Sequence, residues 1–488
     1  MQRIPDATRF ARQMFAHAEL FDLRLNRSLV ALVSGMARHA AGKITQIFST
    51  SCERERAYRL LENASLTVLA VMAALTKAVA NIIKQEPFAY LAIDGSSLNL
   101  TDRGGRKGFG PIGNSIQKSC GLKVISAYAL NACGVPLGVL FQKYWVRIPR
   151  SKTSKAVRNK ENCKRKTADK ETQHWLDIIT ESLQTIAAKK LWFLIDREGD
   201  SRDILLRLMS SKAHFTLRSS WDRLLENTGE DAQPYLRAMM RTAPCKTKYE
   251  VVVPPGNGRR PRIAKMQARV ARVSLKLRDR QKSNPVVVSL HAIWACEVSQ
   301  TKTGDQPLDW MLFTNAPIST EMEIAKAIYS YTLRWRIEDF HRAWKSGHCN
   351  VEDTQLRSVR AATIFAVMQA AVAAKVERMK HLARNEPDAS ADGELSLPER
   401  QALAALVHHN LHPKLAPGGR RQQTKTAPDP ENMSIGIALY WLAILGGYTG
   451  KSSGGPPGTA TINRGYAIVN GAVKALAAVD NFKKFRKM

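Results

Sequence analysis

The stretch LWFLIDREGD, residues 191–200, places five consecutive apolar residues directly before an aspartate, Asp196. A second run, LAIDGSS at 91–97, likewise leads from apolar residues into Asp94. Short unbroken apolar runs are typical of strands buried on both faces, as in α/β proteins. A carboxylate at the end of such a strand lies at the rim of the sheet, where ligands and metal ions collect. The two runs therefore predict an α/β core with both aspartates at the rim of its sheet.

A third carboxylate lies in the stretch YSYTLRWRIEDFHRAWKSG, residues 329–347. On a helix with about 100° between successive residues, Tyr331, Arg334, Glu338 and Lys345 share a sector about 60° wide. A tyrosine, two cations and a carboxylate on one face make a poor apolar contact. They suit a site that holds a metal ion and a phosphate backbone together. The alternative is a solvated helix face that carries an Arg334–Glu338 ion pair.

The three carboxylates, Asp94, Asp196 and Glu338, make chemical sense as one group. Mg²⁺ prefers oxygen ligands and usually binds a few carboxylates together with water and substrate phosphate. Two such ions activate an attacking water or 3′-hydroxyl and stabilise the leaving oxygen of a phosphoryl displacement. Arg334 and Lys345 are suited to holding the neighbouring phosphates. The constellation predicts phosphoryl transfer on a nucleic acid.

The charge of the chain favours the same class of partner. Its 488 residues include 74 Lys and Arg against 42 Asp and Glu, which gives a formal net charge of +32. A protein this basic repels itself unless it binds a polyanion, and nucleic acid is the usual one. The hydrophobic content of 44% and the charged content of 24% are those of a globular protein, so wholesale disorder is excluded.

The cysteines and the apolar segments bear on the cellular compartment. The seven cysteines are scattered without CxxC spacing, which argues against a disulfide framework or a zinc knuckle. The N-terminal segment lacks the apolar core of a secretory signal. The stretches 435–445 and 364–376 are shorter than the roughly 20 residues that span a bilayer. We expect a soluble cytoplasmic protein without a membrane partner.

The pattern along the chain changes several times. Residues 1–70 place apolar side chains at helical spacing and predict a small helical domain whose basic residues face solvent or contact DNA. Strand-like runs begin after residue 71, and the basic stretch 143–170 reads as a solvated loop that suits phosphate contacts. Residues 213–316 favour strands, and helices return from Glu321. This order indicates a β insertion between two parts of an α/β core.

These features together resemble the DDE transposases of the bacterial insertion-sequence-four family. The likeness rests on the two aspartates, on the pattern YxxRxxxExxxxxxK at 331–345, and on several longer segments. Those segments are ERAYRLLEN (55–63), DREGD (196–200), FTLRS (215–219), PLDWMLFTN (307–315), YTLRWRIEDFHRAWKSG (331–347) and LAILGGY (442–448). The resemblance implies an RNase H-like core, related to that of retroviral integrases, with a β insertion at about 219–316. It also implies an N-terminal end-binding domain over 1–70, a catalytic domain over 71–374 and a C-terminal helical dimerisation domain over 375–488.

The resemblance assigns a role to each candidate site residue. By position, Asp94, Asp196 and Glu338 become a metal-binding catalytic triad for Mg²⁺, with Mn²⁺ as a substitute and two ions per site. The residues implied to contact DNA are Tyr331, Arg334, Lys345, Trp310, Arg218, Arg342, Trp335 and Arg38. Trp310 matches the tryptophan on which a flipped thymine stacks, although by pattern alone it reads as a core aromatic. Trp335 either lines the same pocket or packs within the fold.

The implied activity is cut-and-paste DNA transposition. Water nicks one strand at the transposon end, and the freed 3′-hydroxyl attacks the opposite strand to leave a hairpin on the element. A second water opens the hairpin, and the 3′-hydroxyl then attacks target DNA. Two protomers would join two ends in a homodimeric synaptic complex, without a small-molecule cofactor. The alternatives are a structure-specific endonuclease on the same fold and a catalytically silent DNA-binding inhibitor derived from a transposase.

Overall fold

The strands of the protein form one mixed sheet. The computed structural model describes residues 6–20, 22–113, 119–148, 154, 157, 161, 164–226, 234–253, 261–279, 282–299, 306–410, 428–450 and 455–485. Within this part of the chain, ten strands pair in the order β2-β3-β1-β5-β6-β10-β9-β8-β7, and β4 also pairs with β3. The α/β class expected from the sequence is confirmed. Much of the basic stretch expected as a loop at 143–170 lies outside the described residues.

Parallel strands form the centre of this sheet. β1 (Ala89–Asn99) is parallel to β5 (Leu191–Ile195), and β5 is parallel to β6 (His214–Arg218). All five residues of β5 are buried, as its unbroken apolar sequence predicts. The antiparallel strands on either side are β2 (Gly110–Pro111), β3 (Cys120–Leu130), β4 (Pro136–Trp145) and β10 (Asp309–Thr314).

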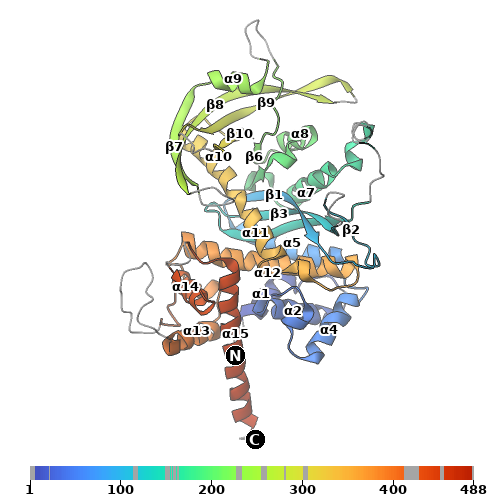
Figure 1. Ribbon diagram of the computed structural model, residues 1–488, viewed down its shortest axis with the longest axis vertical. Helices are drawn as coiled ribbons and strands as arrows, with labels where there is room; N and C mark the ends of the chain where they lie inside the picture. Colours follow the sequence, from blue (N-terminus) through green and yellow to red (C-terminus); the bar gives the residue numbers. More distant parts are fainter. Residues whose placement is uncertain are drawn as a thin grey trace.

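Three long strands continue the sheet beyond β10. They are β7 (Cys245–Val253), β8 (Arg262–Asp279) and β9 (Lys282–Glu297), and they come between β6 and β10 in the sequence. Figure 1 shows them curving away from the parallel centre, with α9 (Leu236–Thr242) beside them. Alternating burial along β8 reflects a face packed against the fold and a face open to solvent.

Helices cover the sheet and connect its strands. α7 (Thr172–Thr185) packs on β3 and β4, α10 (Glu321–Leu333) on β5 and β6, and α11 (Trp335–Lys345) on β1. α8 (Arg202–Ser210) lies beside α7 and connects β5 to β6. These contacts place α11 against the strand that carries Asp94.

One long helix, α12 (Val359–Asn385), joins the sheet to the helices at both ends of the chain. In Figure 1 it lies between the sheet and two helical groups, one blue and one orange to red. The N-terminal group is α1 (Asp6–Phe15), α2 (Leu23–Arg38), α3 (Ile44–Ile47) and α4 (Ser51–Glu62), and the next helix, α5 (Val68–Gln85), packs on β4 of the sheet. The C-terminal group is α13 (Leu397–Asn410), α14 (Ile435–Leu445) and α15 (Thr459–Phe485).

Two of these helices, α5 and α12, are long and apolar enough to cross a membrane by length and composition alone. Their most apolar windows of 18 residues are 44% and 89% buried inside the protein, respectively. The apolar stretch 364–376, which is too short by itself to span a bilayer, lies inside the longer helix α12. The burial of α12 is that of a core helix, with apolar residues such as Ile364, Phe365 and Val367 fully enclosed.

Candidate active site

The parallel pairing of β1 and β5 places the two aspartates side by side. The register pairs Ile93 with Ile195, so the next residues along the two strands are Asp94 and Asp196. Asp196 directly follows β5, as expected, but Asp94 does not end its strand, because β1 continues to Asn99. The continuation arises because β3 remains paired with β1 throughout, whereas β5 stops at Ile195. Asp94 therefore lies where its neighbouring parallel strand ends.

Backbone amide groups hold both carboxylates in position. Asp196 caps a short 3₁₀ turn, and its Oδ1 accepts a hydrogen bond of 2.6 Å from the amide of Glu198. Asp94 Oδ1 accepts a bond of 2.9 Å from the amide of Gly95. Each bond fixes one oxygen of its carboxylate and leaves the other free for a cation.

The helical stretch at 329–347 differs from the single helix expected. A Thr320 capping box starts α10, and the regular helix pauses at Arg334 before α11 begins. Arg334 keeps helical backbone angles (φ −53°, ψ −33°), so the chain direction is preserved across the break. The ring of Tyr331 and the carboxylate of Glu338 both contact the Arg334 side chain, as their shared helix face predicts.

Arg334 lies among the three carboxylates. Its Nη1 is 3.8 Å from Asp94 Oδ2 and 3.9 Å from Asp196 Oδ2. Its Nη2 donates a hydrogen bond of 2.5 Å to Glu338 Oε1. The arginine side chain is only 4% exposed. Side chains more than 240 residues apart in sequence thus converge on one cation, in an arrangement that suits hard oxygen ligation of a divalent ion.

Burial and neighbouring charges perturb Asp94 strongly. Burial raises the pKa of Asp94 to about 7, the Arg334 guanidinium opposes this rise, and the carboxylates of Asp196 and Glu198 reinforce it. Because the folded chain then binds a proton that the unfolded chain releases above pH 3.8, stability falls as pH rises through this window. The acidic site is therefore electrostatically costly to the fold at neutral pH.

Asp94→Asn is expected to stabilise the metal-free protein at pH 8 and to leave it nearly unchanged at pH 4. The asparagine carries no charge at either pH, so the gain at pH 8 is on the order of 1–4 kcal/mol, at about 1.4 kcal/mol per pKa unit. Thermal unfolding with a chelator at the two pH values measures it. An equal effect of the substitution at both pH values would contradict the raised pKa.

Comparison with protein families identifies the domains that contain this arrangement. Residues 165–374 match the model of the transposase DDE domain, and residues 7–66 match that of the transposase DNA-binding domain. The chain is a DDE transposase. The DDE domain makes it an enzyme that cleaves DNA and transfers strands, and it implies an RNase H-like fold. Asp196 and Glu338 lie within the matched segment, whereas Asp94 precedes it and joins them only through the sheet.

Two further side chains near this site, His341 and Glu198, were not predicted from the sequence. His341 Nδ1 is 4.0 Å from Asp94 Oδ2, and burial, with Lys345 and Arg334, lowers the pKa of His341 to about 3. The imidazole is therefore neutral. Glu198 is exposed, close enough to Asp94 to raise the pKa of that residue. The DREGD sequence gave a signal for Glu198, since Glu198 follows Asp196 by two residues across the 3₁₀ turn.

Lys345 lies at the end of α11, beside the last residues of β1. Its Nζ is 3.6 Å from Glu352 Oε1, and the same oxygen accepts a hydrogen bond of 2.8 Å from the amide of Asn99. This contact leaves Lys345 about one quarter exposed. The lysine thus extends the cationic side of the site along β1.

The two tryptophans near the site differ in exposure. Trp310, on β10, is only 8% exposed, and its ring packs edge-to-face with Tyr331 at 5.6 Å between centroids. Trp335 is 53% exposed, and its ring lies 5.3 Å from Arg334 Cζ. The ring of Trp335 is therefore accessible from solvent, whereas the ring of Trp310 is enclosed.

The three remaining residues expected to contact DNA, Arg218, Arg342 and Arg38, have different surroundings. Arg218 ends β6 and donates a hydrogen bond of 2.8 Å to the carbonyl of Asp309, next to Trp310. The Arg342 side chain is 77% exposed and 3.6 Å from Asp339. Arg38 ends α2, and burial lowers its pKa, opposed by Glu53, Tyr466 and Glu399. Arg38 therefore lies near Glu53 of α4 and near Glu399 and Tyr466 of the C-terminal group.

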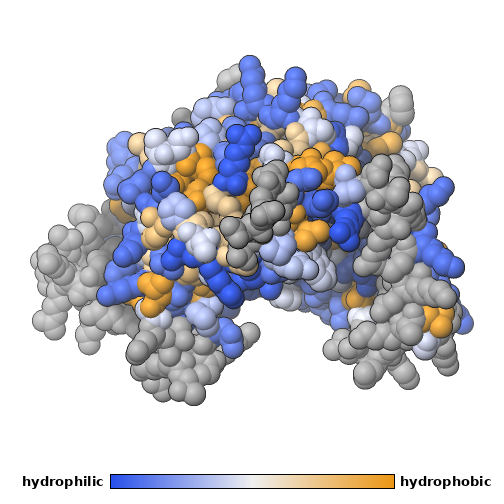
Figure 2. Space-filling model, turned by 90° about the horizontal axis from the view of Figure 1, so that it is seen from above, coloured by the Kyte–Doolittle hydropathy of each residue, from blue (hydrophilic) through white to orange (hydrophobic). Residues whose placement is uncertain are grey.

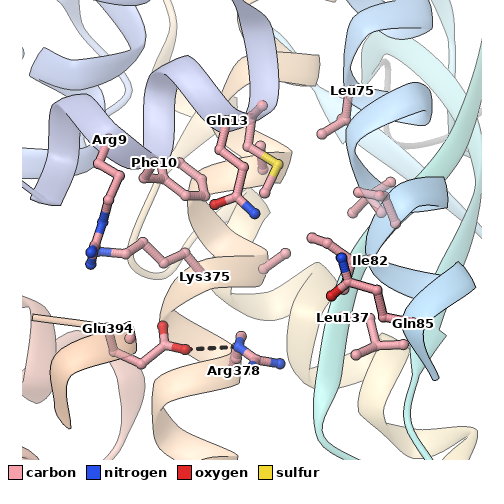
Figure 3. A pocket seen from close by; sticks show the side chains of 17 residues that line it. Arg9, Phe10, Gln13, Leu75, Ile82, Gln85, Leu137, Lys375, Arg378 and Glu394 are labelled. Atoms are coloured by element: carbon pink, nitrogen blue, oxygen red, sulfur yellow. Dashed lines mark hydrogen bonds and ion pairs between the residues drawn. The ribbon is translucent and has the colours of Figure 1, made fainter.

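The hydrophilic surface and the position of the cavity away from the triad favour a large polar partner over a small ligand. Figure 2 shows hydrophilic side chains over much of one face of the transposase, with smaller apolar patches between them. A cavity of about 280 Å³ lies elsewhere, between α1, α5, β4 and α12. Figure 3 shows Arg378 there, ion-paired with Glu394 at 2.8 Å. None of the three triad carboxylates lines this cavity.

Proposed function

We propose that this transposase excises and inserts a DNA element by the cut-and-paste route, with Asp94, Asp196 and Glu338 as its metal ligands. The observation that carries the proposal is the convergence of these three carboxylates on one cationic centre. On the segments quoted above, the chain resembles the insertion-sequence-four group of DDE transposases.

The donor set fits Mg²⁺, or Mn²⁺ in its place. Three carboxylates lie around one positive charge. A separate group, Asp339, Glu377 and His381, has possible ligand atoms within 4.8 Å of one another, and it includes no residue of the triad. A pair of bound ions would polarise the scissile phosphate and lower the pKa of the attacking water or 3′-hydroxyl. Asp94, Asp196 and Glu338 would hold them, with Glu198 placed to assist.

The residues around the triad orient the DNA strand. Arg334 and Lys345 supply charge for the phosphates that flank the scissile bond, and Tyr331 packs against Arg334. Trp310 and Trp335 offer faces for an unstacked base during hairpin formation. Nicking, hairpin formation, hairpin opening and strand transfer are all phosphoryl transfers, so one triad serves each step in turn.

The ends of the chain would recognise and join the transposon ends. Residues 1–70, including Arg38, would bind the DNA at the transposon ends. Residues 71–374 would form the catalytic domain, with β7–β9 as its insertion. Residues 375–488 would join two protomers. α15 supports this last role because Leu476 and Val479 are 57% and 50% exposed on its outer half. A second copy of the chain would cover them in the synaptic complex. We place the reaction on cytoplasmic DNA.

A plasmid carrying the DNA ends that flank the gene tests the function. Purified protein with Mg²⁺ is expected to cut at both ends through a hairpin intermediate and to join the released element to a second plasmid. Cutting that ignores the ends would instead indicate a structure-specific endonuclease. Tight end binding without any cleavage would indicate an inhibitor of transposition.

A further inference from the structure

Arg334 occupies the centre that the triad offers to a cation. Its guanidinium lies within 4 Å of Asp94 and Asp196 and is hydrogen-bonded to Glu338. Divalent ions bind carboxylate oxygens at about 2.0–2.6 Å. An ion bound by the same three carboxylates would therefore lie very close to the positive charge of Arg334. The two cations compete for one set of oxygens.

The guanidinium is not fully satisfied in this position. Of its nitrogens, Nη2 donates to Glu338, whereas Nε and Nη1 are buried and have no hydrogen-bond partner among the described residues. The contacts of Nη1 with the two aspartates are long, at 3.8 and 3.9 Å. A phosphate accepts two parallel hydrogen bonds from a guanidinium, so it would satisfy donors that the triad leaves unpaired.

The exposed neighbours of Arg334 give a route for this exchange. Trp335 is 53% exposed beside Arg334 Cζ, and the Glu338 side chain is 35% exposed. The guanidinium therefore lies just beneath the surface that would receive the DNA strand. A short side-chain movement transfers it from carboxylates to phosphate without unfolding either helix.

We propose that Arg334 is the resident counter-ion of the triad in the DNA-free protein, and that a DNA phosphate withdraws it. Divalent metal then binds tightly only once DNA is engaged, which keeps the unbound enzyme from assembling a cleavage-competent site. This inference rests on the proposed function, because it takes the triad as the metal site.

Mn²⁺ binding to the DNA-free, full-length protein tests the inference, with electron paramagnetic resonance of the free ion as the readout. Arg334→Gln is expected to bind Mn²⁺ on the order of tenfold more tightly than the wild type, or better, since a unit positive charge has left the site. Arg241→Gln removes the same charge from an exposed position on α9 and serves as the matched control. Equal affinities for wild type and Arg334→Gln would overturn the proposal.

Two further measurements separate this proposal from the assignment of the triad. Adding Asp196→Asn to Arg334→Gln is expected to abolish the tight site. If the tight site persists in that double variant, the metal is bound elsewhere and the proposed triad is wrong. Should Arg334→Gln fail to fold, the wild type is titrated with and without a short duplex, with Asp196→Asn alongside to subtract ions bound by the DNA itself. A duplex that leaves the Asp196-dependent affinity unchanged would overturn the counter-ion role alone.

Discussion

Asp196→Asn is expected to lower DNA cleavage about 10³-fold or more, equivalent to roughly 4 kcal/mol of lost transition-state stabilisation. The substitution keeps the side-chain shape but replaces the anionic carboxylate of a proposed metal ligand with a neutral amide. The amide of Glu198 still has an oxygen to bond, so the local turn is retained. Cleavage of the plasmid substrate over time, with Mg²⁺ in excess, measures the loss.

Binding separates a chemical defect from a structural one in this variant. The affinity of the variant for labelled transposon-end DNA is expected to be unchanged or slightly higher, because a negative charge near the phosphates has been removed. Asp169→Asn makes the same change at an exposed residue within the matched DDE segment and should cleave normally. Wild-type cleavage by Asp196→Asn would remove this residue from the metal site.

The sequence predicted the components of the site better than their arrangement. The apolar runs before Asp94 and Asp196 predicted buried strands, and β1 and β5 are buried and adjacent in register. The periodicity at 331–345 predicted that Tyr331, Arg334 and Glu338 share a side, and these three side chains are in contact. Local spacing carries this information because it depends on the geometry of one strand or one helix.

Contacts between distant elements were not accessible in this way. The continuation of β1 past Asp94 depends on its pairing with β3, which apolar runs do not encode. Likewise, the periodicity at 331–345 does not show which strands this helix face lies against. The contacts of Arg334 with Asp94 and Asp196 were therefore not predicted. The spacing instead favoured phosphate as the partner of Arg334. The sequence likewise gave no indication that His341 lies near Asp94, because the two residues are 247 positions apart.

Trp310→Ala is expected to leave the first nick nearly intact and to slow hairpin formation about 5- to 150-fold. Stacking of a base on an aromatic ring contributes roughly 1–3 kcal/mol, and in the proposed mechanism only the hairpin step needs the flipped base. Single-turnover assays that resolve nicked, hairpin and fully cut products measure the two steps separately. Normal hairpin rates would show that this residue has no stacking role.

The burial of Trp310 makes the choice of control decisive. Removing a ring that packs against Tyr331 leaves a cavity, which typically costs about 3–5 kcal/mol of stability for a large aromatic residue. Trp310→Phe keeps most of the packing and a smaller stacking face, so it should fold normally and show an intermediate hairpin rate. Trp335→Ala removes an exposed ring with little effect on folding. If Trp335→Ala stops the hairpin while Trp310→Phe does not, the base stacks on the tryptophan already exposed beside Arg334.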